Sequence, residues 1–327
     1  MTRADPASTA ITPKPQEATM KTTPHLPFGA DVSDVDLRDL SPEDGKALVD
    51  ALAEHHVLRV RGQDLTKGEY DRFGRLFGAP IDFFFTKDLD PDYPALITIS
   101  NSPQHDMGRR DGASFWHTDG SYEYVPASTT MLYAIEAPIE GGETRFTDLT
   151  AAYEALPDAI RARVDRLDAQ HMLVGGKRGP DETPIKLDPD ATDRDGGVRA
   201  KKRAAERPRH PLVITHPISG RRNLYAVAGT PYGVEGLEPE EGEALLETLK
   251  SHAVSPRFNI AFKAEVGDVL IWDNLATLHR ATPIEYSAEE GKRRRLLRIS
   301  TQGLPPVYGD RAPLFVAPEG HASIKLA

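Results

Sequence analysis

The sequence predicts a mainly β fold with flanking helices, in which short strands form a sandwich or barrel. From about residue 95 onward, runs rich in β-branched and aromatic residues recur, and Gly, Pro, Asn or Asp bounds each run. Many short strands separated by such turn residues are typical of sandwiches and barrels. Segments with apolar residues at helical spacing precede this region and interrupt it, and these segments add the helices.

The part of the chain before the strand-rich region predicts two helices. Ser41 is suited to cap the first helix, because a proline and then apolar residues at helical spacing follow it. Residues 57–62, VLRVRG, then predict a short strand. In the second helix, Thr66 and Glu69 have the spacing of a capping box, and Gly78 is suited to end the helix.

The strand-rich region also contains two predicted helices and one long polar loop. The helices span 149–167 and 237–253. The loop, residues 175–209, has little periodicity. A loop of this length in a compact domain is typically a lid or disordered, so we expect a mobile lid insertion. The predicted strands are LITISN, STTMLYAIEA, TRFTDL, LVITHP, NLYAV, FNIAFKA, VLIWDN and RRLLRIST.

Composition and charge narrow the class of protein. The chain has 327 residues, a net charge of -10 and no cysteine. The acidic balance argues against a general nucleic-acid binder, and no apolar run reaches the roughly 18 to 20 residues that span a bilayer. Residues 1–25 lack the apolar core of a signal peptide and predict a disordered tail, followed by a single domain over 26–327. We expect a cytoplasmic protein in which imidazole and carboxylate groups hold any metal.

One short motif and one distant histidine suggest a metal site. In FWHTDGSY, residues 115–122, His117 and Asp119 lie two positions apart and share a face if the chain is extended. Taken alone, the pair is better explained as a hydrogen-bonded polar turn. Much later, VGDVLIWDNLATLHRATP places His279 after an apolar strand, where a barrel can bring it opposite the pair. Two imidazoles and one carboxylate form the facial arrangement of non-haem Fe(II) oxygenases. We call His117, Asp119 and His279 the metal triad.

Five segments of the chain resemble, in order, those of the taurine dioxygenase-like (TauD/TfdA) family. They are FWHTDGSY, APIEGGETRFTDLTAAYEALP, THPISGRRNLYAV, DVLIWDNLATLHRAT and RRLLRIST. The resemblance covers roughly residues 26–305. It implies a double-stranded β-helix, or cupin-like jelly roll, and an enzyme that requires Fe(II), 2-oxoglutarate and dioxygen.

The resemblance also implies roles for individual residues. It assigns the metal triad to iron, a hydrogen bond with 2-oxoglutarate to Thr144, and the distal carboxylate of 2-oxoglutarate to Arg298. A planar guanidinium suits that carboxylate because it forms two parallel charge-assisted bonds. Arg294 lies four residues earlier on the same strand face and is the second candidate for binding an anion. An arginine in a strand also often forms a purely structural ion pair.

Candidate substrate-binding residues lie in the loops. A run of three phenylalanines offers either an aromatic wall or a buried strand edge, and three basic residues offer partners for an anion. The family's taurine-recognising residues are missing, and Ala113 stands where its asparagine would be, so we do not expect taurine as the substrate. The candidates are Phe83, Phe84, Phe85, Arg109, Arg110 and Lys177.

The expected activity is hydroxylation of an unactivated C–H bond in a small, anionic metabolite, with release of succinate and carbon dioxide. Desaturation, cyclisation and oxidative cleavage use the same residues and stay open. Two alternatives of other classes are a metal-dependent hydrolase with zinc in the triad and a non-catalytic jelly-roll binding protein. A homo-oligomer, either a dimer or a tetramer, is compatible with the sequence.

Overall fold

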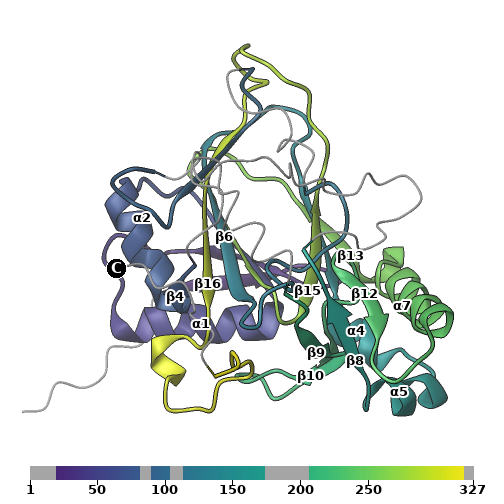
Figure 1. Cartoon of the computed structure of the whole chain (residues 1–327). Helices are drawn as coiled ribbons and strands as arrows, with labels where there is room; N and C mark the ends of the chain where they lie inside the picture. The colour runs from purple at the N-terminus through teal and green to yellow at the C-terminus, as the bar shows by residue number, and fades with distance from the viewer. Residues whose placement is uncertain (1–19, 82–89, 104–112, 174–205, 320–327) are drawn as a thin grey trace, which may run out of the picture.

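The computed structural model describes residues 20–81, 90–103, 113–173 and 206–319. Its larger sheet is eight-stranded and runs in the order β1-β2-β3-β14-β6-β16-β4, with β5 paired to β16 (Figure 1). The bounds of these strands are β1 (Lys21–Pro24), β2 (Ala30–Ser33), β3 (Val57–Val60), β4 (Ala79–Pro80), β5 (Ile97–Ser100), β6 (Ala127–Glu136), β14 (Val269–Asp273) and β16 (Arg295–Gln302).

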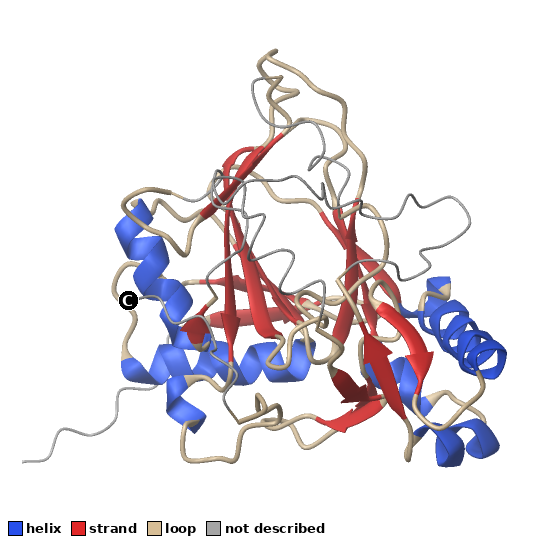
Figure 2. Ribbon diagram, viewed as in Figure 1, coloured by secondary structure: helices blue, strands red, loops and turns tan. Residues whose placement is uncertain are grey.

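A smaller sheet faces the larger one across the molecule (Figure 2). It has three strands in the order β13-β7-β15, which are β13 (Asn259–Phe262), β7 (Thr144–Asp148) and β15 (Thr277–Ala281). Two short sheets extend it: β12 (Pro231–Val234), β8 (Asp168–His171) and β9 (Arg209–Pro211) form one, and β10 (Val213–Thr215) and β11 (Arg222–Leu224) form the other.

The interior lies between the two facing sheets. It is apolar and draws side chains from both, including Leu296 and Trp272 from the larger sheet and Phe146 from the smaller. Side chains alternate along a strand, so Leu297 and Ile299 point the other way and pack beneath the helices. Two facing, mainly antiparallel sheets around a shared interior form a jelly-roll core, as the family resemblance implied.

Two helices cover the outer face of the larger sheet, and both begin as predicted. In α1 (Pro42–His55), the Ser41 hydroxyl accepts a hydrogen bond from the Asp44 backbone N–H at 3.0 Å. In α2 (Lys67–Gly74), Thr66 and Glu69 form the complete capping box. The 3-10 turn η1 (Arg75–Phe77) follows α2, and Gly78, at φ 140°, ends this helical segment.

The prediction of one helix over 149–167 is wrong, because the segment forms two helices. These are α4 (Leu149–Glu154) and α5 (Asp158–Val164), and the break lies at Pro157, which precedes α5. Proline has no N–H to donate and clashes with the preceding helical turn, so it starts a new helix rather than continuing the old one. The predicted helix over 237–253 is confirmed as α7 (Pro239–Ala253), which packs with α4 over the smaller sheet.

Three other expectations need correction. The disordered tail over 1–25 is wrong at its end, because residues 21–24 form β1 and pair with β2. The strand predicted from NLYAV ends at Leu224, since Ala226 adopts a positive φ of 46° that a strand does not allow. His279 lies in the middle of β15 rather than at the start of an element. Of the expected lid over 175–209, residues 175–205 lie outside the described residues.

Two short 3-10 turns complete the described elements, η4 (Pro256–Phe258) before β13 and η5 (Pro306–Tyr308) after β16. Among the helices in the described part of the chain, none has the length and apolar character needed to cross a membrane.

Candidate metal centre

The two histidines of the metal triad meet through backbone pairing. His117 and His279 form an antiparallel bridge, in which each backbone N–H donates to the other residue's carbonyl at 3.0 and 2.9 Å. The two imidazole ring centres lie 4.2 Å apart. Pairing between residues far apart in the chain thus fixes both rings at one place in the barrel.

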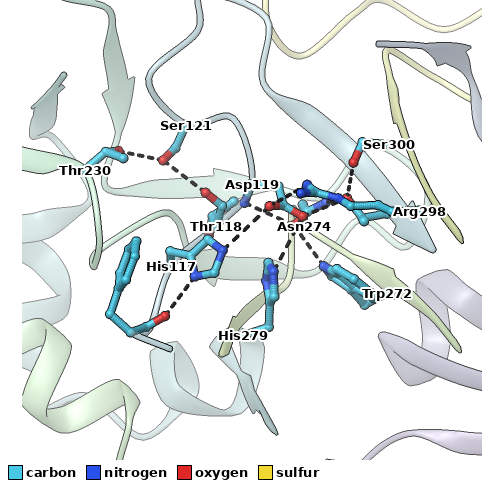
Figure 3. A network of polar contacts seen from close by, with 12 residues as sticks. His117, Thr118, Asp119, Ser121, Thr230, Trp272, Asn274, His279, Arg298 and Ser300 are labelled. Atoms are coloured by element: carbon cyan, nitrogen blue, oxygen red, sulfur yellow. Dashed lines mark hydrogen bonds and ion pairs between the residues drawn. The ribbon is translucent and has the colours of Figure 1, made fainter. Parts of the chain in front are cut away.

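Asp119 completes the group from the turn that follows His117 (Figure 3). Its Oδ1 lies 3.7 Å from Nε2 of His117, and its Oδ2 lies 3.5 Å from Nε2 of His279. One nitrogen or oxygen atom from each residue lies within 4.8 Å of the other two. The structure therefore brings together the three residues that the sequence singled out, and no other such group occurs among the described residues.

Both histidines are held in the form that binds a metal. Nδ1 of His117 lies 2.8 Å from the Phe115 carbonyl oxygen. That oxygen can only accept, so Nδ1 carries the proton and Nε2 keeps a free lone pair. Burial, with a further contribution from His117, holds the pKa of His279 well below its usual range. His279 therefore stays neutral, as metal ligation requires.

The Asp119 carboxylate is ionised. Burial by itself raises its pKa, but its neighbours, above all the guanidinium of Arg298, hold the pKa well below its usual range. Nη2 of Arg298 lies 2.8 Å from Asp119 Oδ1, and the Thr130 hydroxyl donates to Oδ2 at 2.8 Å. Two imidazoles, one carboxylate and no thiolate are the donor set of non-haem Fe(II) sites. The residues present therefore fit iron.

Two aromatic rings pack against His279, and one glycine packs against His117. Trp272 and Phe146 have their ring centres 4.7 and 6.2 Å from that of His279. Gly229 has a φ of +93°, and a Cβ added there would lie 2.7 Å from the Cβ of His117. Only a residue without a side chain allows the 229 backbone to approach His117 this closely.

Replacing Gly229 by alanine is expected to destabilise the protein by about 2 kcal/mol or more, because the left-handed backbone strain adds to an overpacked contact. The displaced His117 ring should also weaken metal binding. Gly62 provides the matched control: it has a φ of +64° but nothing within 4 Å of an added Cβ. Chemical denaturation and metal titration should show that Gly62→Ala costs only the backbone strain and leaves metal affinity unchanged. Equal metal affinity in both variants would contradict the prediction.

Of the remaining predicted residues, Thr144 begins β7 and Arg298 lies in β16, but Arg294 lies directly before β16 rather than on the same strand face as Arg298. Arg298 points into the interior beside the triad, as its contact with Asp119 shows. Arg294 is 6% exposed. Its Cδ lies 3.7 Å from the point where a Cβ added to Gly142 would lie, and Gly142 is two residues before Thr144. The structure thus brings Arg294 to the end of β7 where Thr144 begins, and Arg298 to the metal triad.

Sequence reasoning missed three supporting residues. Thr130 and Asn274 are fully buried and hydrogen-bonded around Asp119, and Asn101 accepts the Arg294 backbone N–H at 2.7 Å. The only signal in the sequence was the Asp-Asn pair that ends the predicted strand VLIWDN. The predicted substrate-binding residues lie outside the described residues; they are Phe83, Phe84, Phe85, Arg109, Arg110 and Lys177.

Comparisons with known proteins agree with this site. The family model for taurine catabolism dioxygenase TauD, TfdA family, matches residues 19–300. The α-ketoglutarate-dependent 2,4-dichlorophenoxyacetate dioxygenase of Cupriavidus pinatubonensis is 33% identical over 290 residues, which cover 85% of this chain and 95% of the relative. α-Ketoglutarate is another name for 2-oxoglutarate.

Two solved structures extend the agreement to the fold. A taurine dioxygenase from Burkholderia xenovorans aligns with a TM-score of 0.69 at 30% identity, covering 93% of this chain and 94% of the other. The structure of AAD-2 in complex with Mn(II) and N-oxalylglycine aligns with a TM-score of 0.67 at 26% identity, covering 88% of this chain and 99% of the other. These matches favour a dioxygenase over the hydrolase and the non-catalytic binding protein. The chain belongs to the TauD/TfdA family and is a non-haem Fe(II)- and 2-oxoglutarate-dependent dioxygenase.

Proposed function

We propose that this enzyme hydroxylates an unactivated C–H bond of a small, anionic metabolite and releases succinate and carbon dioxide. The observation that carries the proposal is the metal triad with Arg298 in β16 and the buried Arg294 directly before that strand. One arginine is needed for the dianionic co-substrate, and the second is available for an anionic group of the substrate. The names of the relatives include a carboxylate and a sulfonate, which supports an anionic substrate.

The metal triad would hold the iron, and the surrounding residues fix the orientation of its side chains. Bound iron supplies the redox chemistry by which dioxygen and 2-oxoglutarate oxidise the C–H bond. The Phe115 carbonyl oxygen accepts a hydrogen bond from Nδ1 of His117, which leaves Nε2 as the nitrogen that would bind iron. The rings of Trp272 and Phe146 pack against the imidazole of His279, which is 5% exposed. The protein therefore contributes metal ligands in fixed orientations and an aromatic surface beside them.

In our proposal, Arg294 and Arg298 bind different anionic groups. Arg294 and Thr144 take the far carboxylate of 2-oxoglutarate, and Arg298 serves the anionic group closest to the metal. Support comes from the 2.8 Å contact of Arg298 with Asp119, which puts this guanidinium beside the metal position. Arg294 lies four residues before Arg298 and directly ahead of β16, so its Cα is at most about 13 Å from that of Arg298. The sequence expectation assigned the far carboxylate to Arg298 instead, and the experiment below separates the two assignments.

Arg294→Gln is expected to weaken 2-oxoglutarate binding by about 30-fold or more, because loss of one partner of a buried charge pair costs about 2 kcal/mol or more. Arg298→Gln should weaken 2-oxoglutarate binding less and raise the KM of the oxidised substrate more. Arg295→Gln is the control, since Arg295 is exposed and pairs with Glu136 on the outside of the strand. Isothermal titration of each metal-loaded variant with 2-oxoglutarate measures the difference. The reverse order would restore the original assignment.

The overall activity is tested by succinate release. The iron-loaded protein is mixed anaerobically with 2-oxoglutarate and then given oxygen, alone and with panels of small carboxylates, sulfonates and sulfate esters. One class should stimulate succinate release, and the product should gain one oxygen atom by mass spectrometry. A product that instead loses two hydrogens would replace hydroxylation by desaturation. His117→Ala should abolish the stimulation, and no stimulation by any anion would overturn the anionic substrate class.

A further inference from the structure

Asn274 lies at the centre of a buried hydrogen-bond network around Asp119. It directly follows β14 and is fully buried. Its Oδ1 lies 3.3 Å from the Asp119 backbone nitrogen and 3.2 Å from Nε1 of Trp272. Its Nδ2 lies 3.0 Å from the Thr130 hydroxyl, which in turn lies 2.8 Å from Asp119 Oδ2 (Figure 3). Asn274 therefore reaches Asp119 by two routes.

The direction of every hydrogen bond in the network follows from the chemistry of its ends. An ionised carboxylate can only accept, so the single hydroxyl proton of Thr130 is donated to Asp119. The Thr130 oxygen must then accept from its other two neighbours, the Asn274 amide and the Ser300 hydroxyl, which lies 2.9 Å away. Asn274 thus donates to the Thr130 oxygen, and Thr130 donates its own proton to Asp119.

The other end of the Asn274 amide is fixed in the same way. The Asp119 backbone N–H and the Trp272 indole N–H are donors only, so both require the amide oxygen. Turning the amide over would set N–H against N–H at two positions. Asparagine is the smallest side chain that offers both an acceptor and an N–H donor here. Because Asn274 and Thr130 are each 0% exposed, no water can take over either part.

We propose that Asn274 is a positioning residue that sets the orientation of the metal-binding carboxylate. It holds the Asp119 backbone directly and the carboxylate through Thr130. Arg298 engages Oδ1 and Thr130 engages Oδ2, so each carboxylate oxygen has its own partner and the group cannot rotate freely. The carboxylate is therefore oriented before a metal binds. This inference rests on the proposed role of Asp119 as a metal ligand.

The test compares Thr130→Val, which has the same shape without a hydroxyl, with Thr130→Ser, which keeps the hydroxyl. Each full-length protein is freed of metal and titrated with Co(II), with affinity measured by chelator competition and coordination followed by visible absorption. Thr130→Val should bind Co(II) about 10- to 100-fold more weakly and shift the absorption bands. Thr130→Ser should restore both, while the Tm of the metal-free protein stays similar in the two variants.

A double-mutant cycle then tests the part played by Asn274. Asn274→Asp keeps an oxygen for both N–H donors but removes the donor to Thr130, and it should weaken Co(II) binding in the otherwise unchanged protein. In the Thr130→Val background the same change should have little further effect, because its route to the carboxylate is already lost. A purely electrostatic effect of the new charge would instead be additive and would overturn the inference.

Two outcomes separate this inference from the proposed function. If the unchanged protein binds Co(II) and Thr130→Val binds it equally well with the same spectrum, the positioning role is wrong and the metal site stands. If the unchanged protein does not bind Co(II) at all, the metal role of Asp119 is wrong, and the positioning role falls with it.

Discussion

Replacing His279 by alanine is expected to lower succinate formation by about 100-fold or more and to remove tight metal binding. Changes to groups that only support a metal ligand already cost about 10- to 100-fold, so loss of a ligand should exceed that range. His279 supplies one of the three converging ligand atoms. The measurement is succinate release with excess iron, together with the metal content after gel filtration.

The control for this prediction is His25→Ala. The His25 side chain is 35% exposed and lies beside Asp31, away from the metal triad. His25→Ala should therefore keep both activity and metal content. If His279→Ala retained more than about a tenth of the activity at saturating iron, a two-ligand site would suffice, and the facial arrangement would be wrong.

Replacing Phe146 by alanine is expected to cost about 3–5 kcal/mol of the free energy of unfolding, the usual range for a buried phenylalanine. Phe146 is 0% exposed, and its ring centre lies 5.6 Å from that of Trp272 and 6.2 Å from that of Phe262. Its ring also stacks on His279, so the same change should weaken metal binding. Urea denaturation of the metal-free protein measures the first effect and Co(II) titration the second.

Phe146→Leu is the matched variant, because a hydrophobic replacement of closer volume keeps most of the packing. We expect it to cost less than half as much as Phe146→Ala. If both variants lost the same free energy of unfolding, the contribution would come from the aromatic ring itself rather than from filled volume. If Phe146→Ala were as stable as the unchanged protein, the barrel interior would not be a packed core.

Local elements could be predicted because their signals are local. Ser41 and the Thr66–Glu69 pair cap their helices through contacts within one turn, so the sequence shows them directly. The break at Pro157 is also a local signal, but it was overlooked because the residues on both sides have helical spacing. The short strands β8, β9 and β12 could not be predicted, since polar residues and bulges obscure the alternation in segments of three or four residues.

In the site, too, residue types could be predicted from the sequence, whereas contacts between distant segments could not. Three ligands of the right chemistry suggested the metal triad, but the antiparallel bridge that joins His117 to His279 depends on strand register. Asn274 could not be assigned a role, because its partners come from β6 and from the turn after His117. The division between Arg294 and Arg298 is also invisible in the sequence. The proposed division depends on structure alone: Arg298 lies in β16 beside Asp119, whereas Arg294 is buried directly before that strand and near Gly142.

The position of β16 in the larger sheet has a consequence for protein synthesis. This strand pairs with β6 on one side and with β4 and β5 on the other, yet it is the last strand of the described chain. At about 5–20 residues per second, a ribosome needs roughly 10–30 s to make the chain between β6 and β16. Throughout that interval β6 has an open edge, which is a template for wrong pairing with other chains. Yield of folded enzyme should therefore depend on how quickly translation delivers this strand.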